Sequence, residues 1–141
     1  MVAVFAVAAV TLSGCVLIPP SPAEVSIRKT VDGLDKAEIG KVLCQHEQRD
    51  FTPLSTVPYQ NSVGIEDVDN SKEVIDYLVA QGFSIRDDLA GSNYQTLSGP
   101  GGIRATVFSL TRDTRKSVSF GDGNSCEVPK SGLVAVNILP Q

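Results

Sequence analysis

The sequence predicts an α+β fold: a twisted antiparallel sheet with two helices packed on one face. Apolar residues recur at helical spacing in two segments, about 36–47 and 71–81. From residue 83 onward, period-two alternation and glycine-rich turns predominate, which is typical of strands. The length of 141 residues suits one domain with its own hydrophobic core, which we expect to span 24–141.

The first helix is expected at about 36–47. Asp35 and Glu38 have the spacing of a capping box, in which each side chain satisfies a free amide of the first turn. One face of this helix would carry Ile39, Val42, Leu43 and His46. Cys44 would then lie in its last turn, close to the core.

The second helix is expected at about 71–81, after a segment rich in Pro, Gly, Asn and Asp. That segment, 50–70, predicts mostly loop, with a short strand near 56–60. The apolar stripe of the helix consists of Val74, Ile75, Leu78 and Val79. Gly82 is expected to end the helix, and Phe83 to pack against Leu78.

The rest of the chain predicts strands joined by polar turns. We expect them at 83–86, 94–97, 103–111, 117–120 and 133–139. Consecutive strands joined by short turns are most simply antiparallel neighbours.

Composition argues against some partners. There are 16 acidic and 12 basic residues, a formal net charge of -4, so nothing indicates affinity for nucleic acid. The chain has no Trp and only 6% aromatic residues, which disfavours binding by stacked aromatic rings.

The first residues form an uncharged apolar segment, 2–12. As a helix these residues would rise about 16 Å, well short of the roughly 30 Å hydrocarbon core of a bilayer. The length suits the apolar part of a signal peptide, although no Lys or Arg precedes it. The alternatives are a secretory signal that is cut elsewhere, and a buried strand or helix.

Leu12, Ser13, Gly14 and Cys15 follow directly, and this motif resembles the lipobox of bacterial lipoproteins. The resemblance implies that 1–14 is a signal peptide, removed by cleavage before Cys15. Cys15 would become the acylated first residue of the mature protein and anchor it at the outer face of the cell membrane. In this respect the chain is similar to uncharacterised lipoproteins of actinobacterial type.

The segment 15–23 contains three prolines in four positions, at 19, 20 and 22. Proline lacks a backbone donor and favours extended chain, so we expect a semi-rigid tether between anchor and domain.

With Cys15 assigned to lipid, Cys44 and Cys126 remain as a pair. In an exported protein an even pair predicts a disulfide, here between residues 82 positions apart. A redox-active pair is the alternative, but the C-x-x-C spacing is missing. A zinc site would need four ligands, and His46 is the only histidine.

His46 is the main candidate for catalysis. With Glu47 beside it and Asp50 four residues on, it could act as a general base in a hydrolase. No nucleophile motif such as G-x-S-x-G accompanies it. A histidine at the end of the predicted helix is better explained by packing or by the helix dipole.

Three further clusters have simple structural explanations. The loop 98–102 is glycine-rich, but it leads into a strand and lacks the spacing of a phosphate loop. The acids of 66–70, with Asp76, contain oxygen ligands but fail the calcium-loop pattern and suit a helix N-terminus. Arg112, Arg115 and Lys116 are expected in a solvated turn, or less favourably against anionic lipid headgroups.

These observations predict a lipid-anchored protein of the cell envelope that acts without catalysis. We expect it to bind an envelope protein or a small molecule, with no cofactor, no metal and no nucleic acid. The alternatives are an envelope hydrolase that uses His46, and an inhibitor or immunity-type protein. An inhibitor would need a protruding loop or edge strand, for which 87–102 is the first candidate.

Overall fold

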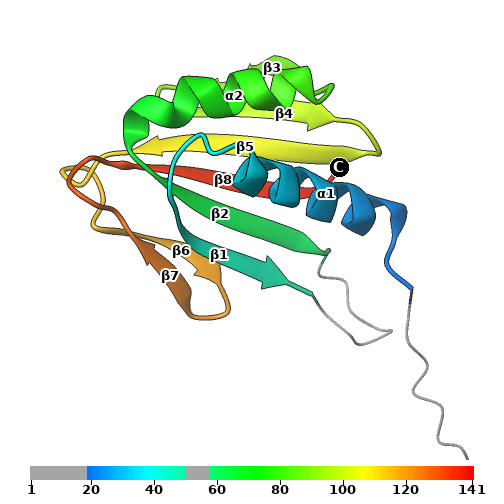
Figure 1. The fold of residues 1–141 in the computed structure, drawn as a ribbon, viewed down its shortest axis with the longest axis horizontal. Helices are drawn as coiled ribbons and strands as arrows, with labels where there is room; N and C mark the ends of the chain where they lie inside the picture. The colour runs from blue at the N-terminus through cyan, green and yellow to red at the C-terminus, as the bar shows by residue number, and fades with distance from the viewer. Residues whose placement is uncertain (1–18, 50–57) are drawn as a thin grey trace, which may run out of the picture.

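The computed structural model describes residues 19–49 and 58–141 and confirms the predicted α+β fold (Figure 1). Helices α1 (Pro22–Lys36) and α2 (Ser71–Ala80), the latter preceded by the short 3-10 helix η1 (Val68–Asn70), cover one face of a six-stranded antiparallel sheet. The strand order in the sheet is β1-β2-β8-β5-β4-β3, and β6 and β7 form a separate hairpin. The strands are β1 (Val42–Gln48), β2 (Gln60–Glu66), β3 (Ser84–Gly91), β4 (Tyr94–Gly99), β5 (Ile103–Leu110), β6 (Ser117–Gly121), β7 (Asn124–Glu127) and β8 (Leu133–Pro140).

The position of the first helix corrects the prediction. It lies at Pro22–Lys36, not at about 36–47. Ser21 is its N-cap, and the Ser21 hydroxyl accepts a hydrogen bond from the Glu24 amide at 3.1 Å. Pro22 occupies the first turn, where the missing backbone donor costs nothing. The predicted tether 15–23 is therefore wrong for its last two residues; its first four lie outside the described residues.

The second half of the predicted helix is instead strand β1. Along Val42–Gln48 the half-buried and exposed residues alternate strictly, as a strand with one covered face requires. Glu38, the residue expected to complete the capping box, has a positive φ of 52° in the turn that follows α1. The apolar spacing between 39 and 46 fits a period of 3.6, but here the period of two prevails.

Two other strand predictions need correction. The strand expected near 56–60 is β2, at Gln60–Glu66; residues 58 and 59 precede the strand, and 56 and 57 lie outside the described residues. β7 lies between the expected strands 117–120 and 133–139, where only a polar turn was expected, and β3 extends beyond the expected range 83–86 through Asp87 and Asp88.

The other elements agree with the predictions within a few residues. α2 ends before Gly82, which has a φ of +92°. The Phe83 amide donates to the Leu78 carbonyl at 3.1 Å, and both side chains are buried in the core. This close packing explains why the end of α2 was predictable from sequence.

Each face of the sheet has its own apolar cluster. On the helix face, Ile27, Val31 and Leu34 of α1 pack on alternate residues of β2, β5 and β8, among them Val63, Val107 and Val136. The residues between these point to the opposite face, where Leu133, Ala135 and Leu110 pack against Phe120 and Cys126 of the hairpin. The hairpin therefore covers part of the face that the helices leave open.

The predicted disulfide between Cys44 and Cys126 is confirmed. It joins β1 to β7, with the two Cα atoms 6.0 Å apart. The disulfide thus links the hairpin covalently to the edge of the main sheet.

Candidate functional site

A row of polar side chains crosses the face of the sheet that lacks helices. The strand register places the following residues directly opposite one another, in strand order: His46, Ser62, Asn137, Thr106, Thr96 and Arg86. Within this polar row the Ser62 hydroxyl is 3.2 Å from Asn137 Oδ1, and the Thr96 and Thr106 hydroxyls are 3.4 Å apart. A hydrophilic band thus runs across a face whose next row contains Gly64, Ala135 and Phe108.

The β6–β7 hairpin lies over one half of this face. The disulfide holds it at one point, and His46 Nε2 lies 3.5 Å from Asp122 Oδ2 at the hairpin tip. Apolar side chains, including Phe120 and Val128, are buried beneath it. The half formed by β3 and β4 is not covered by the hairpin.

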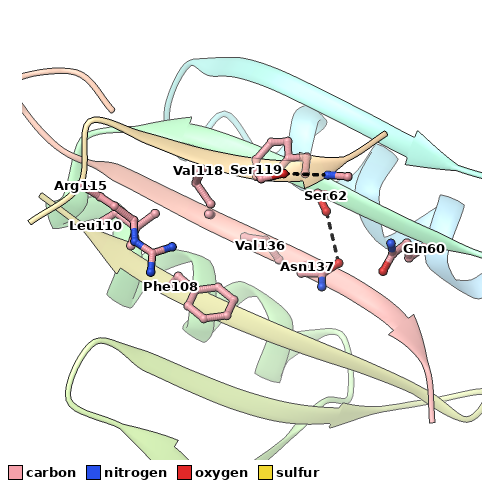
Figure 2. Close-up of a pocket in the computed structure, with 12 residues that line it drawn as sticks. Gln60, Ser62, Phe108, Leu110, Arg115, Val118, Ser119, Val136 and Asn137 are labelled. Carbon is pink, nitrogen blue, oxygen red and sulfur yellow. Dashed lines mark hydrogen bonds between the residues drawn. The ribbon is translucent and has the colours of Figure 1, made fainter. Parts of the chain in front are cut away.

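A pocket of about 350 Å³ lies between the hairpin and the sheet (Figure 2). Its floor is formed by β2, β8 and β5, and its roof by β6. The lining side chains of the floor include Ser62, Asn137, Ala135 and Phe108, and those of the roof include Val118, Ser119 and Phe120. Arg115 lies at one end of the pocket, near Leu110, and Gln60 lies at the other end with Asn137 (Figure 2).

The polar groups at the two ends retain free hydrogen-bonding capacity. Asn137 Oδ1 accepts from Ser62, so the Nδ2 group of this amide has no protein partner among the described residues. Gln60 Nε2 donates to Gln48 Oε1, and Gln60 Oε1 has no partner within 19–49 and 58–141. Arg115 is exposed and forms no ion pair with any described acidic residue. The pocket is therefore apolar in the middle and polar at both ends.

The structure changes the interpretation of His46. His46 lies on β1, so the explanation by a helix dipole is wrong, whereas packing against the hairpin is consistent with its half-buried position. Glu47 points to the other face, where its carboxylate is 2.7 Å from Arg28. Asp50 lies outside the described residues.

Ser62 is opposite His46 in the register, and Asp122 is on its other side. Sequence reasoning did not find this group, because its three members come from β1, β2 and the hairpin tip. The Ser62 hydroxyl is hydrogen-bonded to Asn137, and no hydrogen bond joins it to His46 in the described part of the chain. The arrangement has the residue types of a nucleophile, a base and an orienting acid without their connectivity.

The other sequence candidates are dispersed. The loop 98–102 contains the β4–β5 turn, as expected for a strand connection. Asp67 Oδ1 accepts from the Asp69 amide at the start of η1, while Asp76 pairs with Lys72 on the surface of α2. Within 19–49 and 58–141, no group of three or more His, Cys, Asp or Glu residues is placed to hold a metal ion.

Arg112 and Arg115 of the predicted basic cluster lie at different sites in the structure. Arg115 lines the pocket between the hairpin and the sheet, whereas Arg112 lines a separate depression beside the Cys44–Cys126 disulfide.

The segment 87–102 forms the end of β3, the strand β4 and two tight turns. β3 is exposed along its whole length at the sheet edge.

Cys15 and the apolar segment before it lie outside the described residues. Among the helices that are described, none has the length and apolar character needed to cross a membrane. The chain matches no protein-family model, no curated protein and no solved structure.

Proposed function

We propose that this protein is a lipid-anchored binding module of the cell envelope, which takes a small molecule into the pocket between β6 and the sheet. The observation that carries the proposal is the pocket itself, with its apolar middle and with polar ends that keep hydrogen-bonding groups unpaired in the described part of the chain. Binding sites for small molecules combine an apolar lining with a few polar groups that orient the ligand. The pocket matches this description.

Two features support location outside the cytoplasm. The LSGC motif ends at Cys15, and a disulfide such as that between Cys44 and Cys126 persists in oxidising compartments. α1 begins at Pro22, so an anchor at Cys15 would hold the domain within roughly 25 Å of the bilayer, the span of seven extended residues.

The anchor is tested by intact-mass measurement on protein extracted from membranes. We expect a chain that begins at Cys15 and carries the added mass of acyl groups. A Cys15→Ala variant should appear in the soluble fraction. A mature chain that begins at an unmodified residue other than Cys15 would contradict the anchor.

Binding is tested by NMR, with amide spectra of the full chain recorded against a mixed set of neutral, anionic and cationic fragments. We expect chemical-shift changes at Val118, Ala135 and Asn137 for a subset of the compounds. A Val118→Trp variant should fill the pocket and abolish these changes, whereas Val25→Trp, on the exposed side of α1, should retain them. If no fragment affects the lining residues, the binding function is contradicted.

A hydrolase is the second candidate, favoured by the alignment of Asp122, His46 and Ser62. A rearrangement of the Ser62 hydroxyl from Asn137 towards His46 would connect the three groups. Labelling with a fluorophosphonate, followed by peptide mapping, tests this directly. Modification of Ser62 that disappears in His46→Ala would favour the enzyme, and an unmodified Ser62 would exclude this mechanism.

A further inference from the structure

We propose that the ligand of this pocket is a small organic anion with an apolar body, whose charged group pairs with Arg115. This inference rests on the proposed binding function and specifies its ligand. It derives from the charge of the lining residues, the position of the polar groups and the size of the pocket.

The charge of the lining is the first argument. Arg115 is the only charged residue among the described residues that line the pocket. Its guanidinium has no acidic partner in the described chain, so its donors are available to a ligand. A guanidinium binds carboxylate and phosphate oxygens through paired, charge-assisted hydrogen bonds.

The arrangement along the pocket is the second argument. Phe108 and Val118 lie between Arg115 at one end and Asn137 at the other (Figure 2), and Ala135 also lines the pocket. A ligand that filled this space would place an apolar ring or short chain between the sheet and β6. Its anionic group would face Arg115, and an acceptor at its far end would satisfy Asn137 Nδ2.

The volume limits the size of the ligand. About 350 Å³ is near the lower end of the range of roughly 300–1,000 Å³ for small-molecule pockets. A single ring with a short side chain fits this space, whereas a whole lipid or a polymer could place only one end in it. The ligand is therefore a small acid, bound as its anion.

The test uses three probes with the same phenylalkyl body and an anionic, a neutral or a cationic terminal group: 4-phenylbutyrate, 4-phenylbutanol and 4-phenylbutylamine. Isothermal titration with the full chain, with its disulfide intact, should show that 4-phenylbutyrate binds about tenfold or more tightly than the alcohol. The amine should bind most weakly. A fourth probe, 4-phenylbutyl phosphate, shows whether the site prefers a carboxylate or a phosphate.

Arg115→Ala should remove the preference for the anion, and Arg115→Glu should reverse it in favour of the amine. Arg112→Ala is the matched control, because this residue belongs to the same turn but does not line the pocket. It should leave the affinity for 4-phenylbutyrate within about twofold. Both positions are exposed, so all three substitutions should retain the fold.

Equal binding of the three probes, or an anion preference that survives in Arg115→Ala, would overturn the inference but leave the pocket as a binding site. Failure of all three probes would also overturn it. The proposed binding function would fail only if the wider fragment set also leaves the lining residues unaffected, so the two results are distinguishable.

Discussion

Gly64 lies beneath the sulfur of Cys44: a Cβ atom at Gly64 would be 2.5 Å from Cys44 Sγ. The same atom would be 2.8 Å from Cys126 Sγ. In the register of β1 and β2, Cys44 and Gly64 are directly opposite. The disulfide thus occupies the space that a side chain at Gly64 would need.

Gly64→Ala is therefore expected to destabilise the protein, although alanine is usually preferred to glycine in a strand. The added methyl group would displace the disulfide or the strand, and overpacking of this kind costs about 1–3 kcal/mol. Urea denaturation of the full chain measures the change in the free energy of unfolding.

The cysteine-free background provides the control. In Cys44→Ala/Cys126→Ala the sulfur atoms are absent, so the same Gly64→Ala substitution should be close to neutral. The difference between the two backgrounds is the coupling between glycine and disulfide. An equal loss in both would show that the disulfide is not the cause.

Glu24 provides a second prediction. It is only 5% exposed, and its carboxylate lies 3.1 Å from Arg28 and 3.3 Å from Arg49. Glu24→Gln preserves the shape but removes the charge between two arginines. We expect a loss of about 1–3 kcal/mol, measured by thermal or urea denaturation.

The matched control is Asp76→Asn, which breaks the exposed ion pair with Lys72 on α2. Exposed pairs contribute little because water screens them, so the loss should be clearly smaller than that of Glu24→Gln. If both substitutions lower the free energy of unfolding equally, the buried charge of Glu24 stabilises the protein no more than an exposed charge does.

The buried Tyr59 leads to a prediction about the stability of the fold at high pH. Burial raises the pKa of the Tyr59 hydroxyl above its usual value. As pH rises, the Tyr59 hydroxyl therefore loses its proton in the unfolded chain before it does so in the folded protein. The contribution of Tyr59 to stability is fully present below the usual tyrosine pKa and is lost as pH rises through the raised pKa of the folded state.

Tyr59→Phe should make that alkaline loss of stability less steep, in urea denaturation at pH 9 to roughly pH 11. Tyr94→Phe, at an exposed position on β4, should follow the unsubstituted protein. A Tyr59→Phe curve identical to that of the unsubstituted protein would contradict the prediction.

The fold class was predictable because α2 and the later strands carry strong local signals. Gly82 and Phe83 mark the end of α2, and β5 and β8 are eight-residue strands rich in apolar, β-branched residues. α1 was missed because Pro22 breaks helices in general but suits the first turn. Ala23, Ile27, Val31 and Leu34 have helical spacing, and Ser21 is a cap, so the signal was present.

The site was less predictable, because it depends on pairing between distant strands. Ser62, Asn137 and Thr106 become neighbours only through the order β2-β8-β5, which no local pattern determines. Arg115 was identified as part of a basic turn, but its place at the end of a pocket depends on how the hairpin folds back. The disulfide was the one long-range contact predicted, because counting cysteines requires no topology.

Reduction of the disulfide is expected to release the hairpin from the sheet. The closed chain segment is 82 residues long, and loss of a native disulfide costs about 2–5 kcal/mol. Because the other contacts of the hairpin are a small apolar cluster and the His46–Asp122 pair, its amides should exchange faster than those of β5 and β8.

Hydrogen exchange of the full chain, with and without a phosphine reductant, measures this difference. Because the hairpin forms the roof of the pocket, affinity for any pocket ligand should fall as exchange of β6 and β7 rises. The Cys44→Ala/Cys126→Ala variant should show the same state without reductant and no further response to it. A uniform rise of exchange in all strands would mean that the disulfide stabilises the whole domain and does not act locally on the pocket.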